Sequence, residues 1–251
     1  MIRVLALLIL AWATPASAER VVAALSQNRV QIDTAFTGSE ILVYGAIVRD
    51  LPAPDDSKLG VIVTVSGPEV PTTVRRKERR LGIWVNTDAA VIERAPSFYA
   101  VAASAPIAQI LLGSEDERYF ISPGRALRGV MAAEGLNADK FTEALIRIRE
   151  REGAFQTSDS PLFLTDDTLF STEVRLPANL VEGTYAIRIF LTRDGVVRTR
   201  YDTVISVRKV GLERFLYNLA HEQPLIYGLM SLGIAIFAGW AASAVFRFIK
   251  A

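Results

Sequence analysis

An uncharged segment near the C-terminus constrains this chain more than any other feature. The 22 residues from Leu225 to Phe246 contain no charged residue and no proline. As an α-helix they extend about 33 Å, which matches the roughly 30 Å hydrocarbon core of a bilayer. A buried helix of a soluble protein is rarely this long without a polar interruption. The sequence therefore predicts a transmembrane helix at residues 224–246.

The residues after this segment predict its orientation. Arg247 and Lys250 follow at once, and positive residues near the ends of a span stay on the cytoplasmic side. We therefore expect residues 247–251 to form a cytoplasmic tail, with the preceding domain on the other side of the membrane.

The N-terminus has the pattern of a secretory signal peptide. Arg3 precedes an apolar run from Val4 to Ala13, and the small residues Ala16, Ser17 and Ala18 follow. The apolar run has only 10 residues, too few to cross a bilayer. We expect removal of residues 1–18 and a mature chain that begins at Glu19. The two termini together predict a bacterial inner-membrane protein with its N-terminal domain in the periplasm.

Small residues recur along the predicted transmembrane helix. They lie four residues apart, at Ser231, Ala235, Gly239 and Ser243. Such a row allows another membrane helix to approach closely, which favours packing against a multi-span membrane protein. The alternative is that these residues only reflect the usual composition of membrane helices.

Residues 210–223, which precede the span, predict an amphipathic helix. Leu212, Phe215, Leu216 and Leu219 fall on one face, and polar residues such as Glu213 and Glu222 fall largely on the other. This helix would lie on the outer membrane surface or pack under the preceding domain. Pro224 predicts a break between the two helices.

Composition excludes several kinds of chemistry. The chain has no cysteine, which excludes disulfide bonds, thiolate catalysis, Cys-ligated zinc and lipoprotein attachment. Once Arg3 is removed, 27 Lys and Arg balance 27 Asp and Glu, so net charge gives no indication of nucleic-acid binding.

Residues 19–209 predict a mainly β domain. Val61, Val63 and Val65 alternate with other residues, and the run from Ile41 to Val48 is apolar on both faces, as in a fully buried strand. Further strands are expected at Leu81 to Val85 and at Phe98 to Ala103.

The end of this domain carries the clearest β signal. Alternating residues from Tyr185 to Leu191 precede Asp194-Gly195, and Val196 to Val207 follows. Asp-Gly between alternating strands predicts a tight hairpin. Together with Tyr185, which is placed for a corner contact, this pattern favours an immunoglobulin-like or fibronectin-like sandwich.

A helical insertion interrupts the β pattern. Asn137 is a suitable N-cap, Phe141, Leu145 and Ile148 follow at helical spacing, and Gly153 ends the segment. We expect a first β region at 19–122, a helical insertion at 123–153 and a second β region at 154–209. Two small β domains and one domain with an insertion both fit this length.

The sequence predicts no catalytic, cofactor-binding or metal-binding residues. His221 is the only histidine and has no nucleophile motif near it. Three acidic groups, Asp55-Asp56, Glu115-Asp116-Glu117 and Asp166-Asp167, lack the spacing of a calcium loop and fit solvated turns better. We therefore expect a protein that is not an enzyme.

One surface segment is unusually basic. Arg75, Arg76, Lys77, Arg79 and Arg80 directly precede an apolar segment that contains Trp84. One hypothesis is an anion or partner contact with Trp84 beside it. The other is a charged strand edge that blocks the addition of further strands.

Several segments resemble an alphaproteobacterial family of transmembrane proteins. The resemblance is strongest from Arg75 to Val85 and in the Pro-Ser-Phe-Tyr stretch at 95–102, and it extends to 176–195 and to Leu225-Ile226-Tyr227-Gly228. Members of this family tend to be encoded beside sulfite-exporter-type permeases. The resemblance implies an accessory role to such a transporter, and it assigns no functional residues.

These observations predict a non-enzymatic accessory or interaction subunit of a membrane transporter or envelope complex. The alternatives are a membrane-tethered periplasmic domain that binds or converts a ligand, and a plain structural tether.

Overall fold

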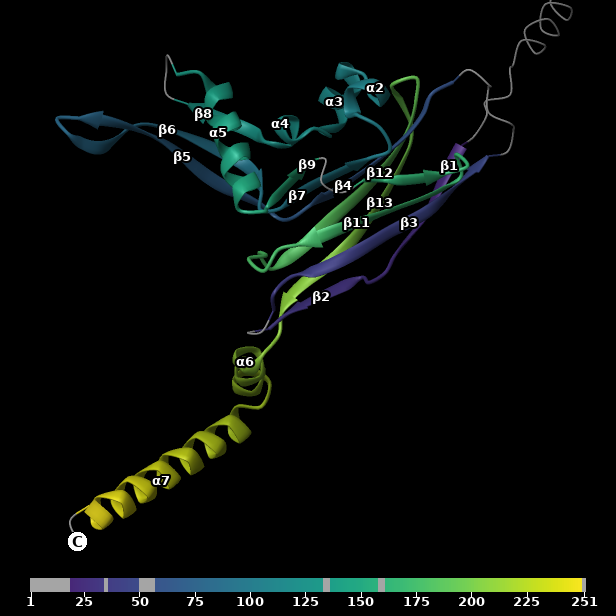
Figure 1. The fold of residues 1–251 in the computed structure, drawn as a ribbon. Helices are drawn as coiled ribbons and strands as arrows, with labels where there is room; N and C mark the ends of the chain where they lie inside the picture. The colour runs from purple at the N-terminus through teal and green to yellow at the C-terminus, as the bar shows by residue number, and fades with distance from the viewer. Residues whose placement is uncertain (1–18, 34–35, 50–56, 133–135, 158–160, 250–251) are drawn as a thin grey trace, which may run out of the picture. The chain divides into compact units, whose positions relative to one another are not determined.

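The computed structural model describes residues 19–33, 36–49, 57–132, 136–157 and 161–249 (Figure 1). The expected signal peptide at 1–18 and the pair Asp55-Asp56 lie outside these residues. The chain divides into one unit of residues 1–30 and 37–207 and another of residues 31–36 and 208–251. Each unit is described by itself.

The first unit is mainly β, as predicted, and strands from both expected β regions share its sheets. The first sheet has the strand order β1-β3-β11-β10 and is antiparallel throughout. Its strands are β1 (Glu19–Leu25), β3 (Ser39–Arg49), β11 (Leu169–Leu176) and β10 (Phe163–Thr165).

The second sheet is larger and has the order β2-β13-β12-β4-β7-β9. Its strands are β2 (Arg29–Ile32), β13 (Val196–Lys209), β12 (Gly183–Arg193), β4 (Leu59–Ser66), β7 (Tyr99–Ala103) and β9 (Phe155–Thr157). The predicted hairpin is confirmed: β12 and β13 are joined at Asp194 and Gly195, which both have positive φ, at 52° and 82°. Positive φ at both central positions is the geometry of the tight hairpin turn that Asp-Gly favours.

A first core lies between these two sheets, which form two layers in Figure 1. Alternate residues of the central strands are buried there, among them Ile41 and Val43 in β3 and Ile187 and Ile189 in β12. The corner contact expected of Tyr185 is present, because its hydroxyl donates to the carbonyl oxygen of Val181 at 2.9 Å. Burial raises the pKa of this hydroxyl above its ordinary value.

One expectation for the first sheet is wrong. The Ile41–Val48 run was expected to be buried on both faces, but Leu42 and Tyr44 of β3 are exposed. Among the described residues, the first sheet buries one face only, and its outer face carries apolar side chains without being covered.

The second sheet is covered on its other face by the segment between β7 and β9. This segment contains α2 (Ile107–Ile110), α3 (Gly113–Tyr119), α4 (Pro123–Ala126), β8 (Arg128–Ala132) and α5 (Ala138–Arg151). Beneath it lies a second core, in which Ile62 of β4 and Phe190 of β12 meet Ile110 and Ile121. The helical part therefore begins earlier than residue 123 and includes a strand.

The cap predicted for the long helix is confirmed. The side chain of Asn137 accepts hydrogen bonds from the backbone N–H of Asp139 at 2.9 Å and of Lys140 at 3.4 Å. Phe141 and Leu145 of α5 are buried. Gly153, two residues beyond the helix, has a φ of 70°, which suits glycine.

A third sheet, with the order β5-β6-β8, lies beneath α5. Strands β5 (Glu69–Arg80) and β6 (Ile83–Pro96) form a long hairpin that extends away from the rest of the β unit in Figure 1. The strand expected to start at Leu81 begins instead at Ile83. Leu81 and Gly82, with φ of 51° and 87°, form the turn.

Tyr99 and Arg188 connect the second sheet to the insertion through hydrogen bonds to residues 119–121. The Tyr99 hydroxyl donates to the carbonyl oxygen of Ile121 at 2.7 Å. Arg188 donates to the carbonyl oxygen of Tyr119 at 2.7 Å and to that of Phe120 at 3.1 Å. Burial raises the pKa of Tyr99 to about 12, although the nearby guanidinium of Arg188 acts in the opposite direction.

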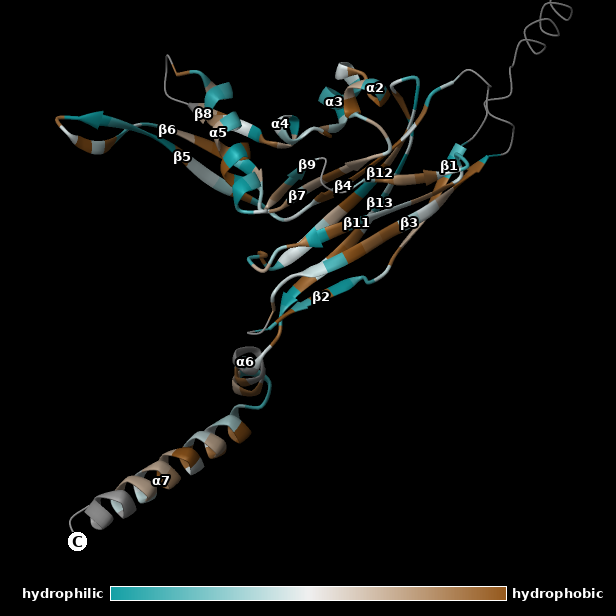
Figure 2. Cartoon of the chain, viewed as in Figure 1, coloured by the Kyte–Doolittle hydropathy of each residue, from teal (hydrophilic) through white to brown (hydrophobic). Residues whose placement is uncertain are grey.

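The second unit contains the two predicted C-terminal helices, α6 (Leu212–Glu222) and α7 (Pro224–Ile249). Residues Pro224–Ser243 of α7 are long and apolar enough to cross a membrane, with a mean hydropathy of 1.8 and no buried part. Figure 2 shows the predominance of apolar residues along this helix. The predicted single span at 224–246 is therefore supported by an apolar helix that has no buried residue from Pro224 to Ser243.

The Tyr99 network predicts a defined stability effect. Tyr99→Phe leaves the Ile121 carbonyl without its donor, so we expect a loss of about 1–3 kcal/mol in the free energy of unfolding. Tyr44→Phe, which removes a hydroxyl from an exposed ring, is the matched control and is expected to change it by less than about 0.5 kcal/mol. Urea unfolding of the full chain in detergent micelles measures both. Equal losses in the two variants would show that the hydrogen bonds of Tyr99 do not contribute to the free energy of unfolding.

The same group predicts a pH dependence. Because the folded pKa of Tyr99 is raised to about 12 from an ordinary value of about 10, the unfolded state loses this proton first. Its contribution is fully present below about pH 10 and is lost as pH rises towards 12. Tyr99→Phe is expected to flatten the fall in unfolding free energy over this range, measured against Tyr44→Phe. An unchanged slope would contradict this assignment.

Candidate functional site

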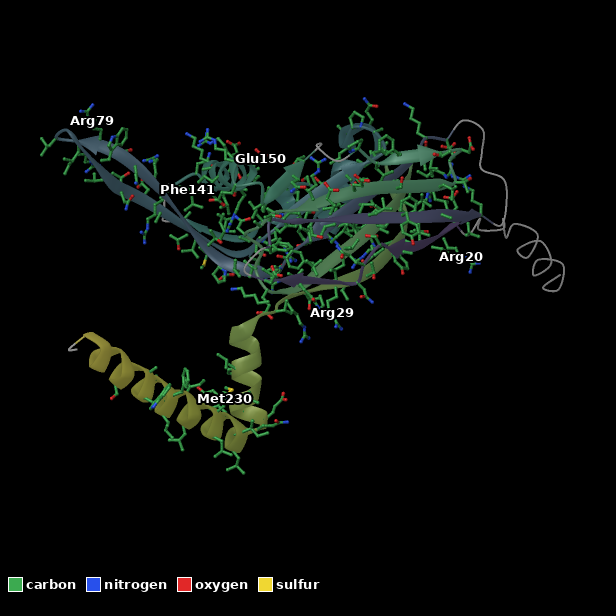
Figure 3. The ribbon with its side chains drawn as sticks, turned by 60° about the horizontal axis from the view of Figure 1, so that its bottom comes forward. Arg20, Arg29, Arg79, Phe141, Glu150 and Met230 are labelled. Carbon is green, nitrogen blue, oxygen red and sulfur yellow. The ribbon has the colours of Figure 1, made fainter. Side chains whose placement is uncertain are left out.

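The β5–β6 hairpin carries the basic segment that the sequence singled out. β8 pairs with β6 only from Ala90 to Arg94, so the hairpin beyond Ala90 is a two-stranded ribbon. β5 and β6 are in register at its end, where Arg79 lies opposite Trp84 and Arg80 opposite Ile83. Figure 3 shows Arg79 at the far end of this hairpin.

The tip of the hairpin is apolar and exposed. Leu81, Ile83 and Trp84 are exposed to 105%, 65% and 68%, and Figure 2 shows hydrophobic colour at the end of the β5–β6 hairpin beside hydrophilic segments. Contiguous large apolar side chains that are rimmed by polar residues are typical of an interaction surface.

Ion pairs divide the basic residues into two groups. Arg76 pairs with Asp88 at 2.5 Å and with Glu78 at 3.1 Å, and Arg80 pairs with Glu78 at 3.7 Å. In contrast, Arg75 and Lys77 make no ion pair with any residue in the described part of the chain.

A groove runs between β5 and α5, with a volume of about 580 Å³. Its apolar lining comes from both elements and from the residue before the cap, and consists of Val74, Leu136, Phe141, Ala144 and Ile148. The charged residues that line it in the described part of the chain are all basic, and consist of Arg75, Arg76, Lys77, Lys140 and Arg147. We call this feature the basic groove.

The charge of the basic groove is largely uncompensated. Lys140 and Arg147, like Arg75 and Lys77, make no ion pair with another described residue, and all four lie exposed. Several cations of one sign along a concave surface attract anions, and salt weakens that attraction. An apolar lining adds burial for any apolar part of a ligand.

The structure separates the predicted site residues. Arg75, Arg76 and Lys77 line the basic groove, whereas Arg79, Arg80 and Trp84 belong to the hairpin tip. Lys140 and Arg147 were not among the predicted site residues, and their spacing of seven residues places them on one face of α5. Only the packing of α5 against the hairpin brings them beside the basic segment.

The structure is compatible with both hypotheses for the basic segment, a charged strand edge and an anion or partner contact. β5 is an edge strand of the third sheet, as a charged edge that blocks strand addition requires. The basic groove supplies what an anion or partner contact requires.

The small residues of α7 have the predicted placement. Ser231, Ala235, Gly239 and Ser243 all belong to α7 and are exposed. The hydroxyl of Ser231 donates to the carbonyl oxygen of Gly228 at 3.0 Å, so this side chain already has a partner within its own helix.

The remaining polar groups have local roles. The ring of His221 stacks on Tyr217 of the same helix at 4.0 Å. The carboxylate of Asp116 accepts from the backbone N–H of Ile121 at 3.1 Å and of Ser122 at 2.7 Å. Within the described ranges, no group of three His, Asp or Glu residues is arranged to hold a metal ion.

Comparisons with known proteins give one family and one distant structure. A family described as "Putative transmembrane protein (Alph_Pro_TM)" matches residues 20–248. No curated protein matches the chain. A solved chain, from work on T cell specificity and activation by the bacterial superantigen toxic shock syndrome toxin-1, matches with a TM-score of 0.26 and 8% identity. That match covers 76% of this chain and 100% of the other, and its TM-score is too low to carry an argument.

The turn at the hairpin tip predicts a stabilising substitution. Leu81 has a φ of 51°, which a branched side chain adopts only with strain, whereas Asn-Gly is the preferred sequence for this turn. We expect Leu81→Asn to raise the free energy of unfolding by about 1 kcal/mol. Leu169→Asn, at an exposed strand position, is the control and is expected to give no gain. Urea unfolding measures the free energy of unfolding of both variants. A loss of stability in Leu81→Asn would contradict the strain argument.

Proposed function

The chain belongs to the transmembrane protein family (Alph_Pro_TM) that matches residues 20–248, and on that premise we propose a non-enzymatic accessory role in a membrane transporter or envelope complex. The protein would act by binding partners rather than by converting a substrate.

The proposal includes a single membrane crossing in the bacterial inner membrane. α7 supplies an apolar helix of sufficient length, and Arg247 and Lys250 after its apolar part favour a cytoplasmic C-terminus. The signal-peptide pattern at 1–18 favours export of the β domain to the periplasm.

The hairpin tip is the observation that carries the interaction role. Three large apolar side chains are exposed together at Leu81, Ile83 and Trp84, at the end of a ribbon that lies beyond the pairing of β8. A protein gains nothing in stability from exposing them there, whereas a partner that covers them gains apolar burial of about 25 cal/mol per Å².

The proposed partner is a multi-span membrane protein, and a sulfite-exporter-type permease is the specific candidate. That candidate rests on the gene neighbourhood that the family resemblance implies. In the bilayer, α7 would contact the partner through Ser231, Ala235, Gly239 and Ser243, since small residues permit close packing of membrane helices.

A second candidate function is that of a membrane-tethered periplasmic domain that binds or converts a ligand. The basic groove favours it, because a volume of about 580 Å³ falls in the range of ligand sites, roughly 300–1,000 Å³. This alternative predicts that the chain binds a small solute with no membrane partner present.

Affinity purification from native membranes tests the accessory role. We expect a specific multi-span protein to co-purify with the full chain, and its recovery to fall at least about tenfold, a change worth roughly 1.4 kcal/mol, in Gly239→Ile with Ser243→Ile. The added bulk would block close approach of a second helix.

The matched control is Gly233→Ile with Ala241→Ile, which adds bulk to largely the opposite face of the same helix. Recovery is expected to stay at the wild-type level in this control. Loss of the partner in both pairs would point to a general defect of the helix, and no specific partner in the wild type would refute the accessory role.

A further inference from the structure

We infer that the basic groove binds an extended peptide segment of a partner protein, one in which acidic and apolar residues alternate. This inference rests on the proposed interaction role and specifies the chemistry of the partner. It depends on three properties of the groove: its charge, its apolar lining and the free edge of β5.

The charge selects an anionic occupant. Four lining residues, Arg75, Lys77, Lys140 and Arg147, make no ion pair with any described residue, and no carboxylate is among the described residues that line the groove. Two of the four lie on β5 and two on α5, so a ligand with several separated negative charges compensates them better than one compact anion.

The lining between the cations favours an occupant that also has apolar groups. Val74 and Phe141 are buried and form the base of the groove, and Ile148 is 43% exposed beside them. Apolar side chains placed on Ile148 would bury surface that the protein alone leaves in contact with water. A purely ionic ligand would leave this surface uncovered.

The edge of β5 favours a peptide over other anionic amphiphiles. Val74–Lys77 line the groove as consecutive residues of a strand that has one neighbour, β6. The backbone N–H and C=O groups on the other side of β5 have no strand partner in the described part of the third sheet. An extended peptide satisfies such groups by adding as a strand, and its alternate side chains then point to opposite sides.

The test uses a dye-labelled synthetic peptide that alternates glutamate and leucine, and the purified full chain in neutral detergent. Fluorescence anisotropy is expected to show binding that weakens as salt is raised. A peptide that alternates lysine and leucine is expected not to bind. Binding of both peptides alike, or of neither, would overturn the inference.

Charge reversal locates the binding. Lys140→Glu with Arg147→Glu is expected to raise the Kd at least about tenfold. The matched control reverses two exposed cations far from the hairpin, Arg20→Glu with Arg29→Glu (Figure 3), and is expected to change the Kd by less than about twofold. An equal effect in both pairs would refute a site in the groove.

A second pair protects the test against a folding defect in α5. Arg75→Glu with Lys77→Glu changes the opposite wall, on β5, and is expected to weaken binding to a similar extent. If this pair folds, as judged by its thermal unfolding, and still binds the peptide normally, the inference is wrong.

Backbone methylation tests strand addition. Two versions of the peptide carry N-methyl groups on alternate residues, one set on the leucines and the other on the glutamates. Strand addition predicts that one set abolishes binding and the other leaves it intact, because only alternate N–H groups face β5. Normal binding of both versions would overturn the strand geometry.

Anionic lipid is the competing occupant. Phosphatidylglycerol in bicelles is expected to leave the bound peptide in place, and full displacement would assign the groove to a lipid headgroup. The peptide measurements need no native partner. A failure of peptide binding would therefore not affect the co-purification result, and a failure of co-purification would not affect the peptide-binding result.

Discussion

Burial of the second sheet on both faces is the constraint on which the rest of the first unit depends. Residues of β4 alternate between two cores: Val61 and Val63 face the first sheet, and Ile62 faces the helical insertion. Gly60 permits this arrangement, because a Cβ atom there would lie 2.7 Å from the Cβ of Ile110 in α2. The insertion therefore packs closely enough on the sheet to form part of the core, and it gives α5 and the third sheet a fixed base.

That arrangement explains why the exposed features lie where they do. The third sheet is joined to the rest through the second core, in which Ala90 and Ile92 of β6 meet Phe141 and Leu145 of α5. Beyond this anchored part, the hairpin buries little, and its tip and the basic groove remain on the surface. The β unit thus supports the hairpin and α5, and these two elements carry the unpaired cations Arg75, Lys77, Lys140 and Arg147 in the described part of the chain.

The parts of the fold that depend on local sequence were predicted well. The Asp194-Gly195 hairpin, the Asn137 cap and the apolar helix α7 each follow from neighbouring residues, and the structure contains all three. The helices α2 to α4 were not distinguished, because four to seven residues are too few to show a helical period. The turn at Leu81 was missed because a leucine at positive φ gives no turn signal.

Only the β5 part of the candidate site could be predicted from the sequence. The basic segment of β5 is visible as a run, whereas Lys140 and Arg147 lie on α5, which begins at Ala138, and they join the segment only through tertiary packing. The exposed outer face of β3, with Leu42 and Tyr44, was likewise out of reach, since an apolar run does not say which faces will be covered.

Our central proposal is that α7 crosses the inner membrane and holds the β domain, with its basic groove, on the periplasmic side. The chain has no cysteine of its own, so single cysteines can be introduced at Ala89, exposed on β6, and at Ala251. A membrane-impermeant maleimide applied to intact spheroplasts is expected to label Ala89→Cys at once and Ala251→Cys only after lysis. Protection of Ala89→Cys, or labelling of Ala251→Cys in intact spheroplasts, would contradict the account.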